Sequence, residues 1–288
     1  MKIGVIGCGN MGGGMIRHLC THGWNVSCFD PSEQACAQMS ALGAQAVATP
    51  EEVARVAEVV ILSLPNADAV DGVMTRIADS LQPDAIILDT TTSEPAMSQA
   101  QSQRAKEHGY FFVDGPVSGG AAAAKSGTMT MLLGGDRTAI DRLQPLLDAL
   151  TAKTVVVGGS GAGHAAKIVN NMLCAANLVL VGEAVQLGGA AGVAPADLLE
   201  AVNAGSGRSA VSEVNFPRWV LPGTFDSGFT MGLMRKDVRL ARTLGQTLGV
   251  DLRGFQGLAD VWLEQTMDIP DNADFNRIAQ RTGGSDHD

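Results

Sequence analysis

The segment Gly7-Cys8-Gly9-Asn10-Met11-Gly12 carries a spacing that suits phosphate chemistry. It follows the apolar run Ile3–Ile6 and opens a segment with helical apolar periodicity. The first glycine allows a tight turn, the second lets the backbone approach a pyrophosphate, and the third allows helix and strand to pack closely. The N–H groups at the helix start then face the phosphates. The spacing predicts a dinucleotide-binding loop that uses Gly7, Gly9, Asn10, Met11 and Gly12.

An acidic residue ends the next apolar run, Val26–Phe29. Asp30 stands where a carboxylate accepts hydrogen bonds from the ribose hydroxyls of NAD and repels the 2′-phosphate of NADP. The following stretch, Pro31–Gln34, contains no arginine that would bind such a phosphate. NAD is therefore the expected cofactor and NADP the less favoured one. FAD uses the same loop, but no second flavin-contacting region is evident in the sequence.

A second candidate group interrupts an apolar helical segment that runs from His164 to about Gly192. Lys167 and Asn171 are four residues apart, so they share one face of this helix. A lysine in an apolar helix is unfavourable unless its ammonium reaches water or a partner. A side chain that simply extends to the surface would satisfy this condition. A functional lysine is the alternative, because the glycine-rich stretch 158–163 beside it predicts a hinge and a cleft.

The elements that position these residues follow from the apolar pattern. Short runs that predict strands alternate with helical stretches up to about residue 160, and the first four runs are almost continuously apolar. This order predicts an α/β fold whose N-terminal domain is a Rossmann-type, doubly wound sheet. The expected strands are Ile3–Ile6, Val26–Phe29, Val59–Leu64, Ala85–Leu88, Phe111–Val113, Met129–Leu133 and Val155–Val157, and the expected helices between the first strands are Met11–His22, Ser32–Leu42 and Ala67–Ser80.

Strand patterns stop after the glycine-rich stretch, and only helical patterns follow. Beyond the long segment from His164 they occur at Pro195–Ala204, Thr230–Leu248 and Phe255–Thr266. The sequence thus predicts an NAD-binding domain over residues 1–161 and an all-helical domain over 162–288 for substrate binding and oligomerisation. The polar tail Gly283–Asp288 is expected to fray.

Composition narrows the class of protein. The 288 residues are 45% hydrophobic and carry a formal net charge of −10, which disfavours nucleic acid as a partner. The five cysteines show no Cys-x-x-Cys spacing and the five histidines do not cluster with them, so we expect free thiols in the cytoplasm and no metal site. The most apolar stretch, Met172–Val181, is interrupted by Asn177, which favours a buried helix over a membrane span.

Four segments, in this order, give the chain a resemblance to the β-hydroxyacid dehydrogenase family, which includes 3-hydroxyisobutyrate dehydrogenases. The resemblance covers nearly the whole chain, from Lys2 to about Gln280. The segments are the glycine loop at 7–12, DGPVSGG at 114–120 continuing into SGTMTMLLGG at 126–135, GAGHAAKIVNN at 161–171, and GSGRS at 205–209 with RKD at 235–237. The chain has Gly14 and Gly115 where the family usually has proline and alanine, which we expect to add backbone freedom near a ligand.

The resemblance implies a role for particular residues. The family's catalytic lysine falls on Lys167 and its substrate-orienting asparagine on Asn171. Its loop for the substrate carboxylate falls on Ser118, Gly119 and Gly120, whose bare amides and hydroxyl suit an anion. Its remaining cofactor contacts fall on Leu64, Pro65, Thr92 and Lys236. For Lys236 alone, an ion pair with Asp237 is the competing interpretation.

The implied reaction interconverts a small β-hydroxy acid and its semialdehyde. Lys167 would accept the hydroxyl proton if burial lowers its pKa toward about 7–8, or donate it in the reverse direction. A tartronate or succinate semialdehyde reductase is a close alternative, and a non-catalytic dinucleotide-binding module is a distant one. Imine reductases typically lack the lysine, and 6-phosphogluconate dehydrogenases show Lys-x-x-His-Asn where this chain has Lys167, Asn170 and Asn171.

Two further expectations concern partners and substrate. The long helical segment from His164 to Gly192 is apolar around much of its circumference, so a homodimer or homotetramer is expected. Arg208 has two interpretations that the sequence leaves open. It either reaches a distal anionic group of the substrate or caps a helix.

Overall fold

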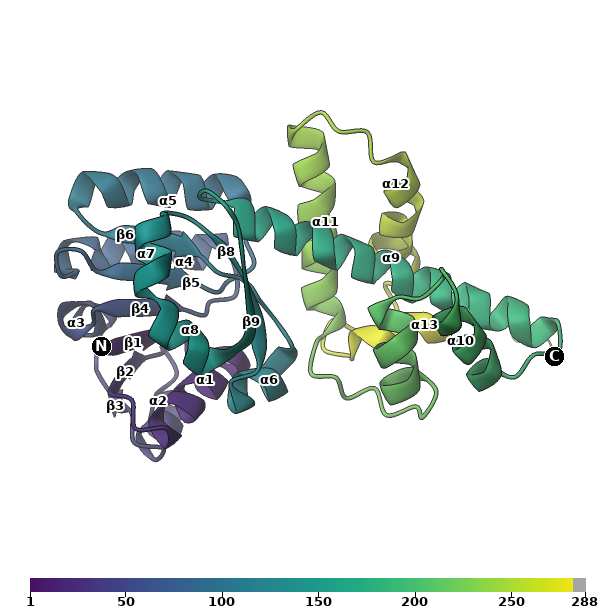
Figure 1. The fold of residues 1–288 in the computed structure, drawn as a ribbon, viewed down its shortest axis with the longest axis horizontal. Coiled ribbons are helices and arrows are strands. Elements are labelled where there is room, and N and C mark those ends of the chain that lie inside the picture. Colours follow the sequence, from purple (N-terminus) through teal and green to yellow (C-terminus); the bar gives the residue numbers. More distant parts are fainter. Residues whose placement is uncertain (282–288) are drawn as a thin grey trace. The chain divides into compact units, whose positions relative to one another are not determined.

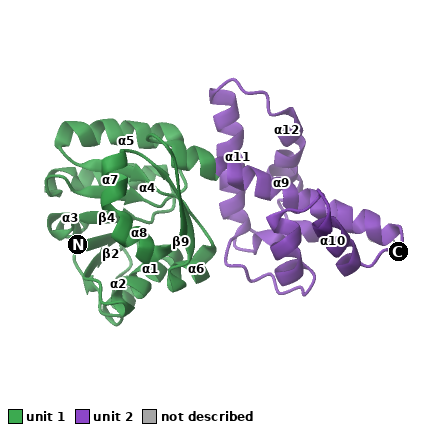
Figure 2. Cartoon of the chain, viewed as in Figure 1, with its two compact units in different colours: residues 1–167 green, residues 168–288 purple. Residues whose placement is uncertain are grey.

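The computed structural model describes residues 1–281, and the expected fraying of Gly283–Asp288 lies outside them. The chain divides into two compact units (Figure 2), Met1–Lys167 and a second that begins at Ile168. The division falls inside one helix, α9 (Ala162–Ala190), whose first turns belong to the first unit. The boundary predicted from the sequence, after residue 161, lies just before this helix.

The first unit is built on one sheet whose strand order is β3-β2-β1-β4-β5-β6-β8-β7, with β9 paired to β8. Strands β1 to β6 run parallel in this order, β8 is antiparallel to β6, and β9 is parallel to β8. This confirms the doubly wound sheet that the sequence predicts. The strands are β1 (Ile3–Ile6), β2 (Val26–Phe29), β3 (Gln45–Ala46), β4 (Val59–Leu62), β5 (Ile86–Asp89), β6 (Phe111–Asp114), β7 (Val117–Ser118), β8 (Met129–Gly134) and β9 (Thr151–Gly158).

Helices cover both faces of this sheet (Figure 1) because successive strand side chains point to opposite sides. On strand β4, Val59 and Ile61 join one core cluster, whereas Val60 and Leu62 join the other. The first cluster packs against α1 (Asn10–Thr21), α2 (Glu33–Ser40), α6 (Gly120–Ser126), α7 (Arg137–Arg142) and α8 (Gln144–Leu150). The second packs against α3 (Pro50–Val56), α4 (Ala67–Ile77), the short η1 (Ala78–Ser80) and α5 (Pro95–His108).

The second unit is all-helical within the described residues, as predicted. Helix α9 packs its buried residues, among them Ile168, Leu178 and Val179, into a core that includes the fully buried Trp262. The indole of Trp262 donates a hydrogen bond to the carbonyl of Ala175. The remaining elements are α10 (Pro195–Ala204), the π-helical η2 (Val211–Val220), α11 (Met231–Thr247), α12 (Arg253–Asp260), the π-helical η3 (Val261–Gln265), η4 (Phe275–Arg277) and α13 (Ile278–Arg281).

The long helix differs from its expected burial. The sequence predicts a buried helix, yet only 33% of its most apolar 18-residue window is buried, and by length and composition alone α9 would be long enough to cross a membrane. Its uncovered residues form a stripe, because they recur at helical spacing. This α9 stripe consists of Val169, Leu173, Leu180 and Leu187, which are 48% to 74% exposed.

Two glycines that distinguish the sequence from the resembling family pack against neighbouring residues. A Cβ on Gly14 would lie 2.9 Å from the Cβ of Ala124, on α6. A Cβ on Gly115 would lie 2.7 Å from the Leu88 side chain. We expected both glycines to add freedom near a ligand. The contacts show that each glycine permits a close packing approach, of helix on helix or of loop on strand, and added freedom near a ligand stays a prediction.

The cysteines among the described residues are free thiols. Cys8 and Cys28 are buried, and their thiols are hydrogen-bonded to each other. This bond, and then burial, raise the pKa of Cys8 far above its ordinary value, so Cys8 stays protonated. Within residues 1–281, no three His, Cys, Asp or Glu side chains are grouped so that they could hold a metal ion.

Candidate dinucleotide and substrate site

The glycine loop has the geometry that its spacing predicts. Gly7 has φ +99°, and a Cβ there would lie 2.2 Å from the carbonyl oxygen of Ser63. A Cβ on Gly12 would lie 1.9 Å from the carbonyl oxygen of Gly7, so only glycine lets α1 start this close to β1. A Cβ on Gly9 would meet nothing within 4 Å. The space beside Gly9 is open, as close approach of a pyrophosphate requires.

The start of α1 is also suited to an anion. Its N-cap, Gly9, offers no side-chain hydrogen bond, and its first turn contains no acidic residue. By contrast, the hydroxyl of Ser32 caps α2 and the amide oxygen of Asn66 caps α4. Unpaired N–H groups and the positive end of the helix dipole attract phosphate oxygens. These residues fit a dinucleotide, whose phosphates would lie at the first turn of α1.

Asp30 is fixed against this loop. Its Oδ2 accepts a hydrogen bond from the N–H of Cys8 at 2.8 Å, and its Oδ1 accepts one from Ser32 at 2.8 Å. Each carboxylate oxygen has a further lone pair available. The carboxylate at the end of β2 therefore lies next to the second glycine of the loop, where the ribose of a bound dinucleotide would follow the pyrophosphate.

The other expected cofactor contacts of the first unit follow neighbouring parallel strands. Leu64 and Pro65 come after β4, and Thr92 comes after β5. A Cβ on Gly7 would lie 3.4 Å from the Leu64 side chain, which places Leu64 beside the glycine loop. The N–H of Leu64 donates to the hydroxyl of Thr91 at 3.2 Å. Ligands of open parallel sheets bind at this carboxyl edge, where Leu64, Pro65 and Thr92 all lie, so their contact with a cofactor stays a prediction.

The substrate loop and the candidate lysine are in direct contact. The Nζ of Lys167 donates a hydrogen bond to the hydroxyl of Ser118 at 2.8 Å, and Lys167 is only 7% exposed. Gly119 and Gly120 have φ +114° and +66°, so the loop after Ser118 takes a conformation that favours glycine. The lysine therefore does not extend freely into solvent. Its ammonium is held beside the loop predicted to bind a carboxylate.

A buried carboxylate that the sequence did not predict as functional anchors the start of α9. The Oδ1 of Asp114 accepts from the N–H of Gly161 at 2.7 Å, and its Oδ2 accepts from that of His164 at 3.1 Å. Burial raises the pKa of Asp114 from its usual value, and the N–H donors of the helix start counteract this effect. Asp114 thus caps, from the end of β6, the helix that carries Lys167.

Asn171 and Lys236 lie in the second unit, on α9 and α11. Asp237, which is buried, accepts a hydrogen bond from the Nδ2 of Asn171 at 2.5 Å, and its other oxygen lies 3.4 Å from the Nζ of Lys236. The ion pair that competes with a cofactor role for Lys236 is therefore present, but with a buried carboxylate. Asp237 fixes the amide of Asn171, since that amide's nitrogen must face the carboxylate. The sequence did not predict this contact.

Arg208 is exposed in the loop after α10. The hydrogen bonds at the start of the following helix come from Ser209 and Ser212, whose hydroxyls accept each other's N–H groups. These capping hydrogen bonds do not involve Arg208, and its contact with a substrate anion stays a prediction.

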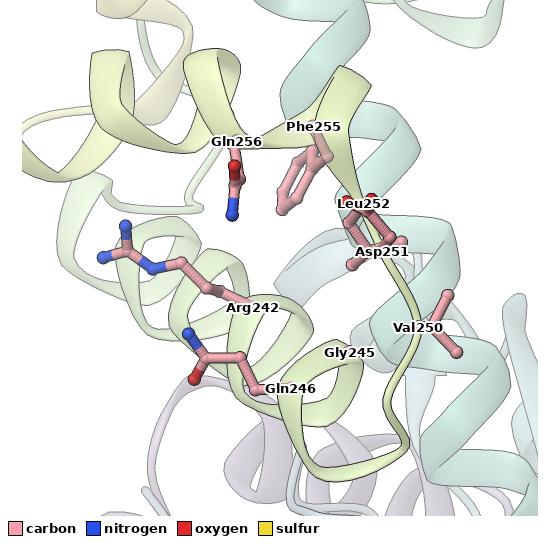
Figure 3. Close-up of a pocket in the computed structure, with 8 residues that line it drawn as sticks. All are labelled: Arg242, Gly245, Gln246, Val250, Asp251, Leu252, Phe255 and Gln256. Atoms are coloured by element: carbon pink, nitrogen blue, oxygen red, sulfur yellow. The ribbon is translucent and has the colours of Figure 1, made fainter.

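A small cavity of about 70 Å³ lies elsewhere in the second unit (Figure 3). This volume is far below the several hundred cubic ångströms of a typical ligand pocket. None of the predicted site residues lines it. Its walls are Arg242, Gly245, Gln246, Val250, Asp251, Leu252, Phe255 and Gln256.

The fold and the glycine loop define a two-unit, dinucleotide-binding protein, and comparison with known proteins agrees. Residues 2–159 match the family model described as the NAD binding domain of 6-phosphogluconate dehydrogenase. Residues 161–282 match the model described as NAD-binding of NADP-dependent 3-hydroxyisobutyrate dehydrogenase. Together these matches cover both units.

Similar proteins narrow the class further. The chain is 35% identical over 255 residues to 2-(hydroxymethyl)glutarate dehydrogenase of Eubacterium barkeri, covering 88% of this chain and 85% of that protein. It is 34% identical over 253 residues to human mitochondrial 3-hydroxyisobutyrate dehydrogenase, covering 83% and 74%. The solved structure of Mycobacterium tuberculosis 3-hydroxyisobutyrate dehydrogenase with L-serine superposes with a TM-score of 0.91 at 28% identity, covering 97% and 98%. The chain belongs to the β-hydroxyacid dehydrogenase family.

Proposed function

We propose that this protein is an NAD-dependent dehydrogenase that interconverts a small β-hydroxy acid and its semialdehyde, with Lys167 as the group that transfers the proton. The observation on which this proposal rests is the buried Lys167 ammonium, whose Nζ lies 2.8 Å from the hydroxyl oxygen of Ser118 at the end of β7. The membership of the β-hydroxyacid dehydrogenase family supports the reaction class.

Each residue of the candidate site has a separate role in the proposed reaction. Neutral Lys167 takes the proton of the substrate hydroxyl in oxidation, and charged Lys167 returns it in reduction. A bound dinucleotide supplies the hydride acceptor or donor. Ser118 holds the lysine side chain, and with Gly119 and Gly120 it offers hydroxyl and amide donors to the substrate carboxylate. Asn171, one helical turn after Lys167 and oriented by Asp237, hydrogen-bonds the substrate.

The direct test is a spectrophotometric screen at 340 nm with NAD and NADP and their reduced forms. The alcohols should include 3-hydroxyisobutyrate and 2-(hydroxymethyl)glutarate, on which the named relatives act, and the aldehydes should include tartronate and succinate semialdehydes. We expect turnover with at least one β-hydroxy acid. Dinucleotide binding without turnover of any of these acids would favour the non-catalytic module instead.

The cofactor preference gives a prediction about Asp30. The fixed carboxylate should repel a 2′-phosphate, and like charges brought together disfavour binding strongly, so kcat/KM should be at least about tenfold higher with NAD than with NADP. Asp30→Asn keeps one oxygen acceptor for the loop and should narrow this ratio. Glu33→Gln, an exposed acid three residues away, is the control and should leave it unchanged. A wild-type preference for NADP would contradict the prediction.

The α9 stripe supports self-association, and we propose a second copy of the chain as its occupant. Four aliphatic side chains on one helix face need an apolar partner, and an identical stripe on another copy supplies one about a twofold axis. The stripe lies on α9, the longest helix among the described residues, and its residues are separated by four and seven positions, which suits packing against a parallel or antiparallel helix.

Light scattering at micromolar concentration tests this assembly. We expect a dimer or tetramer for the wild type and a smaller species for Leu173→Glu/Leu180→Glu, because two carboxylates would be buried in the interface. Leu248→Glu, at an exposed leucine outside the stripe, should leave the mass unchanged. A monomeric wild type would contradict this proposal. Sedimentation of the wild type together with lipid vesicles would indicate that the stripe binds lipid instead of a second copy.

A further inference from the structure

His164 is a buried polar residue to which the proposed reaction assigns no role. It stands in the first turn of α9, three residues before Lys167, so both project from the same side of the helix. Its side chain is 0% exposed. The Nε2 lies 2.6 Å from the carbonyl oxygen of Thr91, and the Nδ1 lies 2.7 Å from the hydroxyl of Ser98. A carbonyl oxygen only accepts, so Nε2 carries a hydrogen whatever the charge of the ring.

The Oδ2 of the buried Asp89 lies 3.9 Å from Nε2, and the two hydrogen-bond partners of the ring belong to different parts of the first unit. Thr91 lies in the turn after β5, directly before the expected cofactor contact Thr92, and its hydroxyl accepts the N–H of Leu64. Ser98 lies in the first turn of α5, and its carbonyl accepts a hydrogen bond from the hydroxyl of Ser160. The imidazole therefore joins the ends of β4 and β5, the start of α5 and the start of α9.

This link complements the anchor at Asp114. Asp114 holds the backbone at the start of α9 through two N–H groups, but a helix end held only by its backbone can still turn about its axis. The His164 ring bonds sideways, to the turn that carries Thr92, and so fixes which way the face bearing Lys167 points. A leucine of similar volume would fill the space but would leave the Thr91 carbonyl without its buried donor.

We propose that His164 is a positioning residue that holds the cofactor-contacting turn Thr91–Thr92 and Lys167 in register with each other. This inference rests on the proposed function of Lys167 and adds a coupling that neither the glycine loop nor the lysine supplies. The hydride and the proton must leave adjacent atoms of one substrate, so the turn and the lysine must be aligned together.

The experiment compares three variants of the full chain with the wild type. His164→Leu removes both ring bonds, His164→Gln keeps an N–H donor that reaches toward Thr91, and Ser98→Ala removes only the Nδ1 partner. Gln101→Leu is the matched control, because it deletes another hydrogen bond of α5, from the buried Gln101 to the exposed Asp71 at 2.8 Å, outside the site. Each protein is measured for melting temperature, NAD affinity by calorimetry, and kcat and KM.

We expect His164→Leu to lose up to about 10²-fold in kcat, the effect of a misplacement near 1 Å, and to bind NAD several-fold more weakly. KM for the hydroxy acid should change little, because Ser118 and the glycines bind it. His164→Gln should recover most of the NAD affinity, and Ser98→Ala should show an intermediate loss. Gln101→Leu should lower the melting temperature without changing kcat or the affinity for NAD.

The inference is overturned if folded His164→Leu keeps kcat and NAD affinity within about twofold of the wild type, or loses them only as far as Gln101→Leu does. If His164→Leu does not fold, His164→Gln and Ser98→Ala decide, and wild-type values in both would overturn it. Failure of the proposed function is a different result, namely a wild type that turns over no substrate. The calorimetric comparison still decides whether His164 positions the cofactor-binding turn.

Discussion

Lys167→Ala is expected to lower kcat by about 10² to 10⁴-fold, the usual contribution of a positioned acid or base. The affinity for NAD should barely change, because we propose that the glycine loop and Asp30, not Lys167, bind the dinucleotide. In the oxidation direction the rate should rise with pH as Lys167 loses its proton, and in the reduction direction it should fall. Both slopes should disappear in the alanine variant. Steady-state kinetics across pH and calorimetry measure these effects.

Three further substitutions test the proton-transfer role, and the first separates it from the charge of the side chain. Lys167→Arg retains a cation and a donor for Ser118, but arginine stays protonated, so this variant should be about as inactive as the alanine one. Lys153→Ala, at an exposed lysine on β9, should have wild-type kinetics. Asn171→Ala should reduce kcat/KM by less than Lys167→Ala, since the proposed role of the amide is to orient the substrate and it transfers no proton. Near-normal turnover of Lys167→Ala would exclude the proposed mechanism.

Gly9→Ala and Gly12→Ala should fail in different ways, although both lie in one loop. The Gly9 methyl would meet no protein atom within 4 Å, so the variant should melt like the wild type. It would occupy the space proposed for the pyrophosphate, and NAD affinity should fall by at least about tenfold, equivalent to ~1.4 kcal/mol. Calorimetry with NAD measures the affinity, and a thermal melt without NAD measures the melting temperature.

The Gly12 methyl would collide with backbone, 1.9 Å from the Gly7 carbonyl oxygen, and no rotamer change relieves such a contact. We expect Gly12→Ala to lose several kcal/mol of stability or to remain insoluble, since overpacking costs about 1–3 kcal/mol even where side chains can move. Gly72→Ala, in α4, is the control, because its Cβ would also meet nothing within 4 Å. Equal melting temperatures for Gly9→Ala and Gly12→Ala would contradict this account of the loop.

The parts of the fold that local patterns determine were predictable. The apolar strands β1 and β2, the glycine loop between β1 and α1, and Asp30 all lie within the first 30 residues and depend on neighbours in sequence. Helix α11 was predictable within a residue at each end, because Thr230 is a capping residue and its hydroxyl accepts the N–H of Leu233.

Helix α5 was not predictable in this way. Its inward face consists of Ser98, Gln101 and Ala105, which give no apolar periodicity. These residues are buried because they pack on the sheet and satisfy polar partners elsewhere in the chain. Strand β9 was predicted from its valines, but these are partly exposed, since the strand lies at an edge of the sheet.

The candidate site was also predictable only where it depends on residues that are close together in the sequence. The resemblance gave Lys167, Ser118 and Asn171 by their segments alone. Their supporting contacts join residues far apart in the chain, from Asp114 to Gly161 and His164, and from Asn171 to Asp237. No spacing in the sequence reports a pair separated by about fifty residues or more. Asp114 directly follows an apolar run, and His164 stands at the start of an apolar helical segment. Polar residues in such places were a usable sign of a buried contact, because a buried polar group needs a partner.

The uncapped start of α1 should affect how fast the protein is degraded in a cell. Without a dinucleotide, the amides of Asn10 to Gly12 have no side-chain acceptor, so this turn should open more readily and exchange its hydrogens faster than the strand before it. Phosphate binding completes the helix, and the folded state then gains stability with the logarithm of cofactor concentration. Degradation by proteases that attack transiently opened chains would accordingly slow when the nucleotide pool is full. The abundance of this enzyme would then follow the supply of its own cofactor.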